Sequence, residues 1–143
     1  MIDTSFLERC IDALEKSLKK LEHSEKNSVE YDIYRSACIK EFELILEQSG
    51  KLLKKTLKPY FHSSKEADKL TFKDIFRHAA KHSIISTEEA ERWLKYRDNR
   101  NTTAHDYGSG FAEETLRLMP EFIKDAHGVT KAVQKEQSDE DQE

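Results

Sequence analysis

The spacing of apolar residues restricts the fold of this chain more than any other feature. In the segment 5–23, Phe6, Cys10, Leu14 and Leu21 recur at helical intervals, and charged residues fill the positions between them. This spacing places apolar side chains on one stripe of an α-helix. The 143 residues include only four Gly and two Pro, whereas an all-β protein needs many turns. The sequence therefore predicts an all-α fold.

The same pattern continues along the chain and predicts an antiparallel bundle of four to five helices. The expected helical segments are residues 5–23, 29–60, 71–85, 86–100 and 109–133. Thr71 and either Ser86 or Thr87 are suited to cap helix starts, the second of these with glutamates behind it. Pro120 predicts a kink in the last segment, or else marks its true first turn.

The domain organisation expected from this pattern is simple. Residues 1–133 are predicted to form one helical domain, because the chain is long enough for a single core. Residues 134–143 read QKEQSDEDQE, are acidic and lack apolar side chains. They are therefore expected to be a disordered tail.

Charge and hydropathy exclude several classes of protein. A net charge of -4 and an isoelectric point near 5.9 argue against binding nucleic acid through bulk charge, although a local basic site remains open. No apolar run approaches the roughly 18 residues of a membrane span, and the N-terminus lacks the apolar core of a signal peptide. Cys10 and Cys38 are too few for a disulfide framework or a zinc site. We expect a cytoplasmic protein that does not associate with membranes and packs its thiols in the core.

A histidine pair raises the question of a metal site. His78 and His82 stand four apart on a predicted helix, and Asp74 could supply a third ligand at helical spacing. The pair lacks the glutamate of an H-E-x-x-H arrangement, and Lys81 stands between the two histidines in the sequence. A polar helix face explains the pair better, and no metal or other cofactor is expected.

A basic run in KLLKKTLKPY leaves two interpretations open. Its four lysines are at positions 51, 54, 55 and 58. The favoured interpretation is the solvated face of an amphipathic helix, and the alternative is a strip that faces phosphate groups.

The stretch YRDNRNTTAHDY, residues 96–107, holds the most reactive set of side chains. Arg97 and Arg100 can each clamp a phosphate with a planar fork of donors, and His105 can exchange a proton near neutral pH. Asn101 precedes His105 by one helical turn and could orient its ring. On spacing alone, a polar helix end stopped by a glycine at position 108 explains the stretch better than a catalytic site does.

These residues resemble a known family. RNTTAH fits the R-x-x-x-x-H signature of the HEPN superfamily, and Tyr107 extends it to the R-x-x-x-x-H-x-Y form of the HepT-type toxins, also called nucleotidyltransferase substrate-binding proteins. RSACIKEFELILEQSGKLLK resembles the second helix of that family, through Phe42, Glu43 and Glu47. FKDIFRHAAKHSII and EEAERWLKYRDNR resemble the helix that leads to the signature, so the likeness spans about residues 3–130. The chain departs at Gly50, where the family commonly has an aromatic residue.

The resemblance implies a HEPN-like bundle that forms a symmetric homodimer and cleaves RNA without a metal. Arg100 and His105 are the catalytic residues that it implies, with Asn101, Arg97 and Glu43 in support. His105 would serve as acid or base, and Arg100 would stabilise the charge that develops on the phosphate.

The resemblance also implies a partner. This is a minimal nucleotidyltransferase that acts as an antitoxin by adding AMP to the signature tyrosine, here Tyr107. Adding a nucleotide beside Arg100 would fill the cleft and neutralise the charge that RNA needs. The alternative is a non-catalytic subunit that presents a nucleotide or another substrate to the nucleotidyltransferase.

Overall fold

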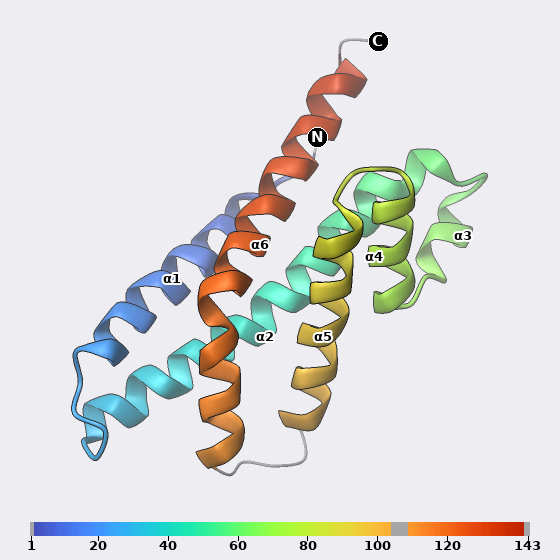
Figure 1. The fold of residues 1–143 in the computed structure, drawn as a ribbon. Coiled ribbons are helices and arrows are strands. Elements are labelled where there is room, and N and C mark those ends of the chain that lie inside the picture. The colour runs from blue at the N-terminus through green and yellow to red at the C-terminus, as the bar shows by residue number, and fades with distance from the viewer. Residues whose placement is uncertain (1, 104–108, 142–143) are drawn as a thin grey trace.

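The protein is built from helices that run antiparallel to their neighbours along the chain (Figure 1). A computed structural model describes residues 2–103 and 109–141, and for 101–103, 109–112 and 139–141 it describes the backbone only. Its helices are α1 (Ser5–Glu22), α2 (Val29–Leu57), α3 (Ser64–Asp68), α4 (Phe72–Lys81), α5 (Thr87–Thr103) and α6 (Ser109–Asp141). A 3-10 turn, η1 (Lys58–Tyr60), follows α2, and no strand occurs within the described ranges. The predicted all-α class is confirmed.

Helix α2 is the centre of the fold, because it contacts each of the other described α-helices. Phe42, Ile45, Leu46 and Leu53 on α2 are fully buried, and the Phe42 ring packs 4.6 Å from that of Phe122 on α6. The buried set continues through the predicted stripe of α1. Helices α1 and α6 lie on one side of the molecule, and α4 and α5 lie on the other (Figure 1).

The predicted apolar stripe is misplaced at two positions. Phe6 is 50% exposed, whereas its neighbour Leu7 is buried, because the face of α1 that meets the core is rotated by one position in its first turn. Ile33 on α2 is likewise 58% exposed. Periodicity identifies a helix, but the precise edge of its buried face depends on what packs against it.

Local side-chain chemistry explains where the helices begin. Thr71 and Asp74 form a reciprocal capping box at the start of α4, as the sequence predicts. Ser86 does the same for α5: its hydroxyl accepts from the Glu89 amide at 3.0 Å, and its own amide donates to the Glu89 carboxylate at 3.1 Å. Each cap satisfies amides that have no partner within the helix.

Helix α4 ends earlier than predicted, at Lys81 and not at Ile85. Ser83 adopts a positive φ of 60°, and the Ile84 amide bonds back to the Ala79 carbonyl at 2.9 Å. This left-handed residue closes the helix in the way that a glycine usually does. The turn allows α5 to run back alongside α4 (Figure 1).

Residues 134–141, which the sequence predicts to be a disordered tail, continue α6 in the structure. Gln134 donates to the Thr4 hydroxyl at 3.2 Å, Gln137 donates to the Ile2 carbonyl at 3.1 Å, and the Tyr60 hydroxyl donates to Glu136 at 3.0 Å. These contacts with distant parts of the chain hold an acidic segment that has no apolar side chain of its own. Pro120 lies inside α6, as the sequence predicts, and α6 changes direction along its length (Figure 1).

None of the helices within the described residues has the length and apolar character that crossing a bilayer requires.

Candidate functional site

Helix α5 carries the start of the predicted signature, and aromatic packing fixes the position of this helix. Trp93 is fully buried, with its ring 5.0 Å from Phe76 of α4 and 5.5 Å from Phe122 of α6. Tyr96 packs edge-on against Phe122 at 4.9 Å. These rings occupy the inner face of α5, so they fix which of its residues can face solvent.

Arg97 and Arg100 form a pair of like charges one turn apart on α5, and both are half-buried. Burial lowers the pKa of the Arg97 guanidinium, and the positive charge of Arg100 lowers it further. Among the residues that the structure describes, neither guanidinium has a carboxylate within ion-pair distance. Two close, partly desolvated cations with no ion pair to a described carboxylate are suited to an anionic group such as a phosphate.

A pocket of about 190 Å³ lies beside Arg97, between α2, α4 and α5. The residues that line it are Glu47, Gly50, Lys51, Lys54, Phe72, Ile75 and Arg97. The guanidinium carbon of Arg97 lies over the Phe72 ring, at 4.9 Å from its centre. A Cβ atom on Gly50 would stand 3.2 Å from the Phe72 ring, so the glycine allows this ring to approach the backbone of α2. We call this cavity the basic pocket.

The four lysines of the basic run, three on α2 and Lys58 in η1, fall into two pairs in the structure. Lys51 and Lys54 line the basic pocket, whereas Lys55 and Lys58 do not. Lys51 pairs with Glu47 at 3.3 Å, and Lys54 lies 3.9 Å from Asp68 of α3. The structure therefore narrows the phosphate-facing interpretation to Lys51 and Lys54, and that interpretation stays a prediction.

The remaining predicted site residues fall into two groups. Glu43 is half-buried on α2, one turn before Glu47 on the face that leads to the basic pocket. Asn101 belongs to α5, but its side chain lies outside the described residues. His105 and Tyr107 also lie outside them, so the pairing of Arg100 with His105 stays a prediction.

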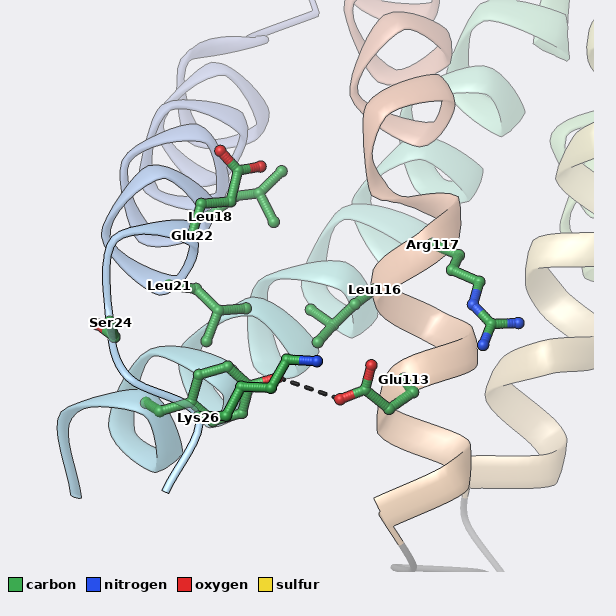
Figure 2. A pocket seen from close by; sticks show the side chains of 9 residues that line it. Leu18, Leu21, Glu22, Ser24, Lys26, Glu113, Leu116 and Arg117 are labelled. Atoms are coloured by element: carbon green, nitrogen blue, oxygen red, sulfur yellow. Dashed lines mark hydrogen bonds between the residues drawn. The ribbon is translucent and has the colours of Figure 1, made fainter. Parts of the chain in front are cut away.

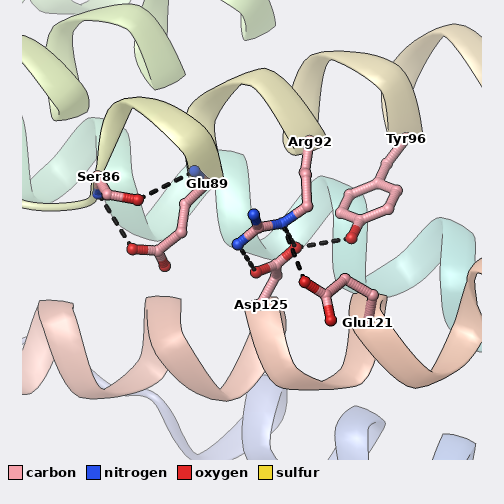
Figure 3. Close-up of polar contacts among 6 residues, drawn as sticks. All are labelled: Ser86, Glu89, Arg92, Tyr96, Glu121 and Asp125. Atoms are coloured by element: carbon pink, nitrogen blue, oxygen red, sulfur yellow. Dashed lines mark hydrogen bonds and ion pairs between the residues drawn. The ribbon is translucent and has the colours of Figure 1, made fainter.

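A buried polar network that the sequence analysis missed joins α5 to α6 (Figure 3). Asp125 is only 4% exposed and accepts two hydrogen bonds from Arg92, each of 2.8 Å, and one from the Tyr96 hydroxyl at 2.6 Å. The bonds to Asp125 raise the pKa of Arg92, and burial, aided by the same carboxylate, raises the pKa of Tyr96. Both shifts favour the protonated forms, so Arg92 stays a cation and the Tyr96 phenol stays neutral at neutral pH.

The network and one further bond position the two helices that flank the signature. This further bond lies nearer to the signature: Asn99 of α5 donates to the buried Thr115 hydroxyl of α6 at 2.9 Å. One signal in the sequence could have revealed the network: Asp125 falls on the apolar stripe of the last helix, between Phe122 and Val129. A carboxylate at such a position requires a partner.

The histidine pair belongs to an aromatic cluster. The His82 ring stacks on Tyr60 at 4.1 Å, and the His78 ring meets the edge of Phe61 at 5.2 Å. Asp74, the third residue considered, takes part in the capping box. Within the described parts of the chain, no group of three or more His, Cys, Asp and Glu side chains could hold a metal ion.

A second pocket, of about 300 Å³, lies between α1, the start of α2 and α6 (Figure 2). Leu18, Leu21 and Leu116 give it an apolar wall, and Tyr31 donates to Glu113 across it at 3.1 Å. Its other charged residues are Glu22, Lys26 and Arg117, so positive and negative charges balance. This pocket is larger than the basic pocket but lacks the excess positive charge that suits a phosphate.

Solved structures show the same fold. One, from Haemophilus influenzae, is described as the fold of a substrate-binding domain of a nucleotidyltransferase. It has a TM-score of 0.79 and 22% identity over 92% of this chain and 99% of that one. A second, from Thermus thermophilus, has a TM-score of 0.63 and 25% identity over 84% of this chain and 98% of that one.

Sequence comparison gives a consistent result. A probable ribonuclease HepT from Haemophilus influenzae is 29% identical over 96 residues, which are 67% of this chain and 64% of that protein. The match thus spans less than two thirds of the relative's own length. Residues 4–135 match the family described as nucleotidyltransferase substrate-binding protein-like. A match of that extent confirms the family expected from the signature, and the chain belongs to the nucleotidyltransferase substrate-binding protein-like family.

Proposed function

We propose that this protein is a metal-independent endoribonuclease of the HEPN type and acts in the cytoplasm as the toxin of a toxin–antitoxin pair. The observation that carries the proposal is the pair of half-buried cations Arg97 and Arg100, of which Arg97 lines the basic pocket and Arg100 is the first residue of the R-x-x-x-x-H-x-Y signature. Membership of the family and the likeness to a probable ribonuclease support it.

The proposed reaction is attack by an RNA 2′-hydroxyl on the adjacent phosphorus. A bond forms between the 2′-oxygen and phosphorus, and the bond from phosphorus to the 5′-oxygen breaks. One His105 takes the proton of the attacking hydroxyl, and a second His105 gives a proton to the leaving oxygen. Arg100 stabilises the charge on the phosphate oxygens, Arg97 and Glu43 support the site, and Asn101 orients the imidazole. Because one chain has a single signature histidine, this scheme needs a homodimer.

The proposed partner is a minimal nucleotidyltransferase that acts as the antitoxin. The phenol oxygen of Tyr107 attacks the α-phosphorus of ATP, pyrophosphate leaves, and the phenol proton passes to solvent. The product carries AMP next to Arg100, where its phosphate competes with RNA for the same positive charge.

An RNA cleavage assay tests the nuclease. The wild-type protein is expected to cut RNA equally well with and without a chelator, whereas His105→Ala and Arg100→Ala are expected to lose at least about 100-fold in rate. His23→Ala is the matched control, because that ring is exposed and bonds to its own helix through the Lys19 carbonyl. Cleavage that needs a divalent metal, or that survives in both signature variants, would contradict the proposal.

Intact-mass measurement after co-expression with the nucleotidyltransferase tests the modification. The wild-type chain and the control Tyr60→Phe, which changes an exposed tyrosine, are expected to gain one adenylyl group. Tyr107→Phe is expected to gain none. An adduct that persists on Tyr107→Phe would place the modification elsewhere.

A non-catalytic subunit that binds a nucleotide for the transferase is the second candidate. The family's description and the related substrate-binding domain favour it, and the basic pocket could hold a nucleotide phosphate. Nucleotide binding by a wild-type protein that neither cuts RNA nor arrests growth would establish this candidate over the nuclease.

A further inference from the structure

We infer that the basic pocket binds a backbone phosphate of an RNA strand, next to the phosphodiester that Arg100 addresses. The inference concerns Lys51, Lys54 and Arg97, which come from two helices and meet only in the folded protein. It rests on the proposed function for the identity of the ligand as RNA.

The charge of the pocket favours an anion. Three cations line it against one carboxylate, Glu47. The ion pair between Lys51 and Glu47 is weak, because both side chains are more than half exposed, at 58% and 59%. Lys54 lies 3.9 Å from Asp68, which is long for an ion pair. A phosphate can therefore recruit both lysines with little loss of existing interactions.

The pocket lies close to the start of the signature, because Arg97 precedes Arg100 by one turn of α5. Arg97 lines the pocket, and Arg100 is close enough to lower the Arg97 pKa through its charge. A strand with one phosphate at Arg100 would present its neighbouring phosphate to the pocket. A protein with a net charge of -4 needs such local positive charge to hold RNA.

The size and lining of the pocket indicate which part of RNA it takes. A volume of about 190 Å³ is small for a whole nucleotide but accommodates a phosphate with part of its ribose. The Phe72 ring cannot stack a base, because Arg97 covers it at 4.9 Å, Phe76 packs against it at 4.6 Å and Gly50 approaches it from α2. The pocket therefore positions the strand without reading its sequence.

Binding of an uncleavable RNA tests the inference. The probe is a fluorescent single strand with 2′-O-methyl groups throughout, which removes the attacking hydroxyl, and anisotropy is measured over a range of salt. Lys51→Gln combined with Lys54→Gln is expected to weaken binding about tenfold. The salt dependence should become shallower by about 0.7 for each phosphate that the protein no longer neutralises. The weakening should be equal for oligo-A and oligo-U probes.

The chain offers a matched control within the same basic run. Lys55→Gln combined with Lys58→Gln removes the same charge from the same basic run but leaves the pocket intact. This control should change affinity less than about twofold, with the salt slope preserved. Equal weakening by both double variants, or none by the pocket variant, would overturn the inference. Binding of AMP that depends on the pocket lysines, with RNA binding unaffected, would also overturn it.

Cleavage measured in parallel separates this inference from the proposed function. If the wild-type protein cuts RNA and the pocket variant binds normally, the pocket assignment is wrong and the nuclease stands. If no cleavage occurs but RNA binding depends on Lys51 and Lys54, the pocket assignment stands and the nuclease is wrong.

Discussion

The guanidinium carbon of Arg97 lies 4.9 Å from the centre of the Phe72 ring, so a cation of α5 rests on an aromatic side chain of α4. The ring holds the guanidinium at the wall of the basic pocket. Without this contact a long arginine side chain at the end of a helix would sample many positions. The relationship makes Phe72, which has no polar atom of its own, a positioning residue for the proposed site.

Replacing Phe72 by Leu tests this role, since it keeps apolar volume but removes the face of the ring. A cation–π contact of this kind contributes about 0.5–1 kcal/mol, so RNA affinity is expected to fall about two- to fivefold. Phe61→Leu, on a ring that packs against His78, serves as the control. Unchanged affinity in Phe72→Leu, measured by the same anisotropy assay, would show that Arg97 does not need the ring.

Asp125→Ala is expected to be the most destabilising of the substitutions considered, because it removes the acceptor of two Arg92 bonds and of the Tyr96 hydroxyl and leaves Arg92 with its longer, 3.5 Å pair to Glu121. The Arg92 side chain is 34% exposed and can partly hydrate, so we expect a loss of about 2–3 kcal/mol, less than for a fully buried pair. Urea unfolding measures it.

An exposed ion pair serves as the control for the loss of stability expected of Asp125→Ala. Asp12→Ala breaks the pair between Asp12 and Lys16, whose side chains are largely exposed. It should cost no more than about 0.5 kcal/mol. Similar losses for Asp125→Ala and Asp12→Ala would mean that the network between α5 and α6 adds little to stability.

Ser86→Ala is expected to lower the free energy of unfolding by about 1 kcal/mol, because it removes the hydroxyl that accepts from the Glu89 amide at the start of α5. Thr87→Ala, one position later, is the control. It keeps the cap and should change stability by less than about 0.5 kcal/mol. If the two variants unfold at the same urea concentration, the cap is not what stabilises this helix start.

The two thiols are expected to be inert in the native protein. Burial raises the pKa of Cys10 and of Cys38 from 9.0 to about 11, with the carboxylates of Glu41 and Glu22 adding to the effect. At pH 8 only about one thiol in a thousand is then ionised, so alkylation should be slow until the protein unfolds. Fast reaction of either thiol at pH 8 would contradict the core position.

The same pKa values give a dependence of stability on pH. The folded state favours the neutral thiol, so the stabilisation is complete below pH 9 and is lost as the pH rises from 9 towards 11. A variant with Cys10→Ala and Cys38→Ala should begin less stable but lose stability less steeply over this interval. Parallel curves for the variant and the wild-type protein would argue against the shifts.

Local sequence signals were sufficient for much of the fold. The all-α class, the starts of α4 and α5 and the burial of both cysteines follow from side chains within a few positions of one another. The family signature is equally local, since it spans eight consecutive residues from Arg100 to Tyr107. For such features the interacting groups are neighbours along the chain, and helical geometry alone brings them together.

Other features required the folded chain. The continuation of α6 to Asp141 depends on contacts with Thr4 and Ile2 at the opposite end of the sequence. The bonds from Arg92 to Asp125 bridge separate helices, and only the packing of α4 and α5 against α2 selects Lys51 and Lys54 over Lys55. A helical repeat states which residues share a face, but not which partner that face meets. The partner is decided by how whole helices pack, because that packing minimises exposed apolar surface over the entire chain.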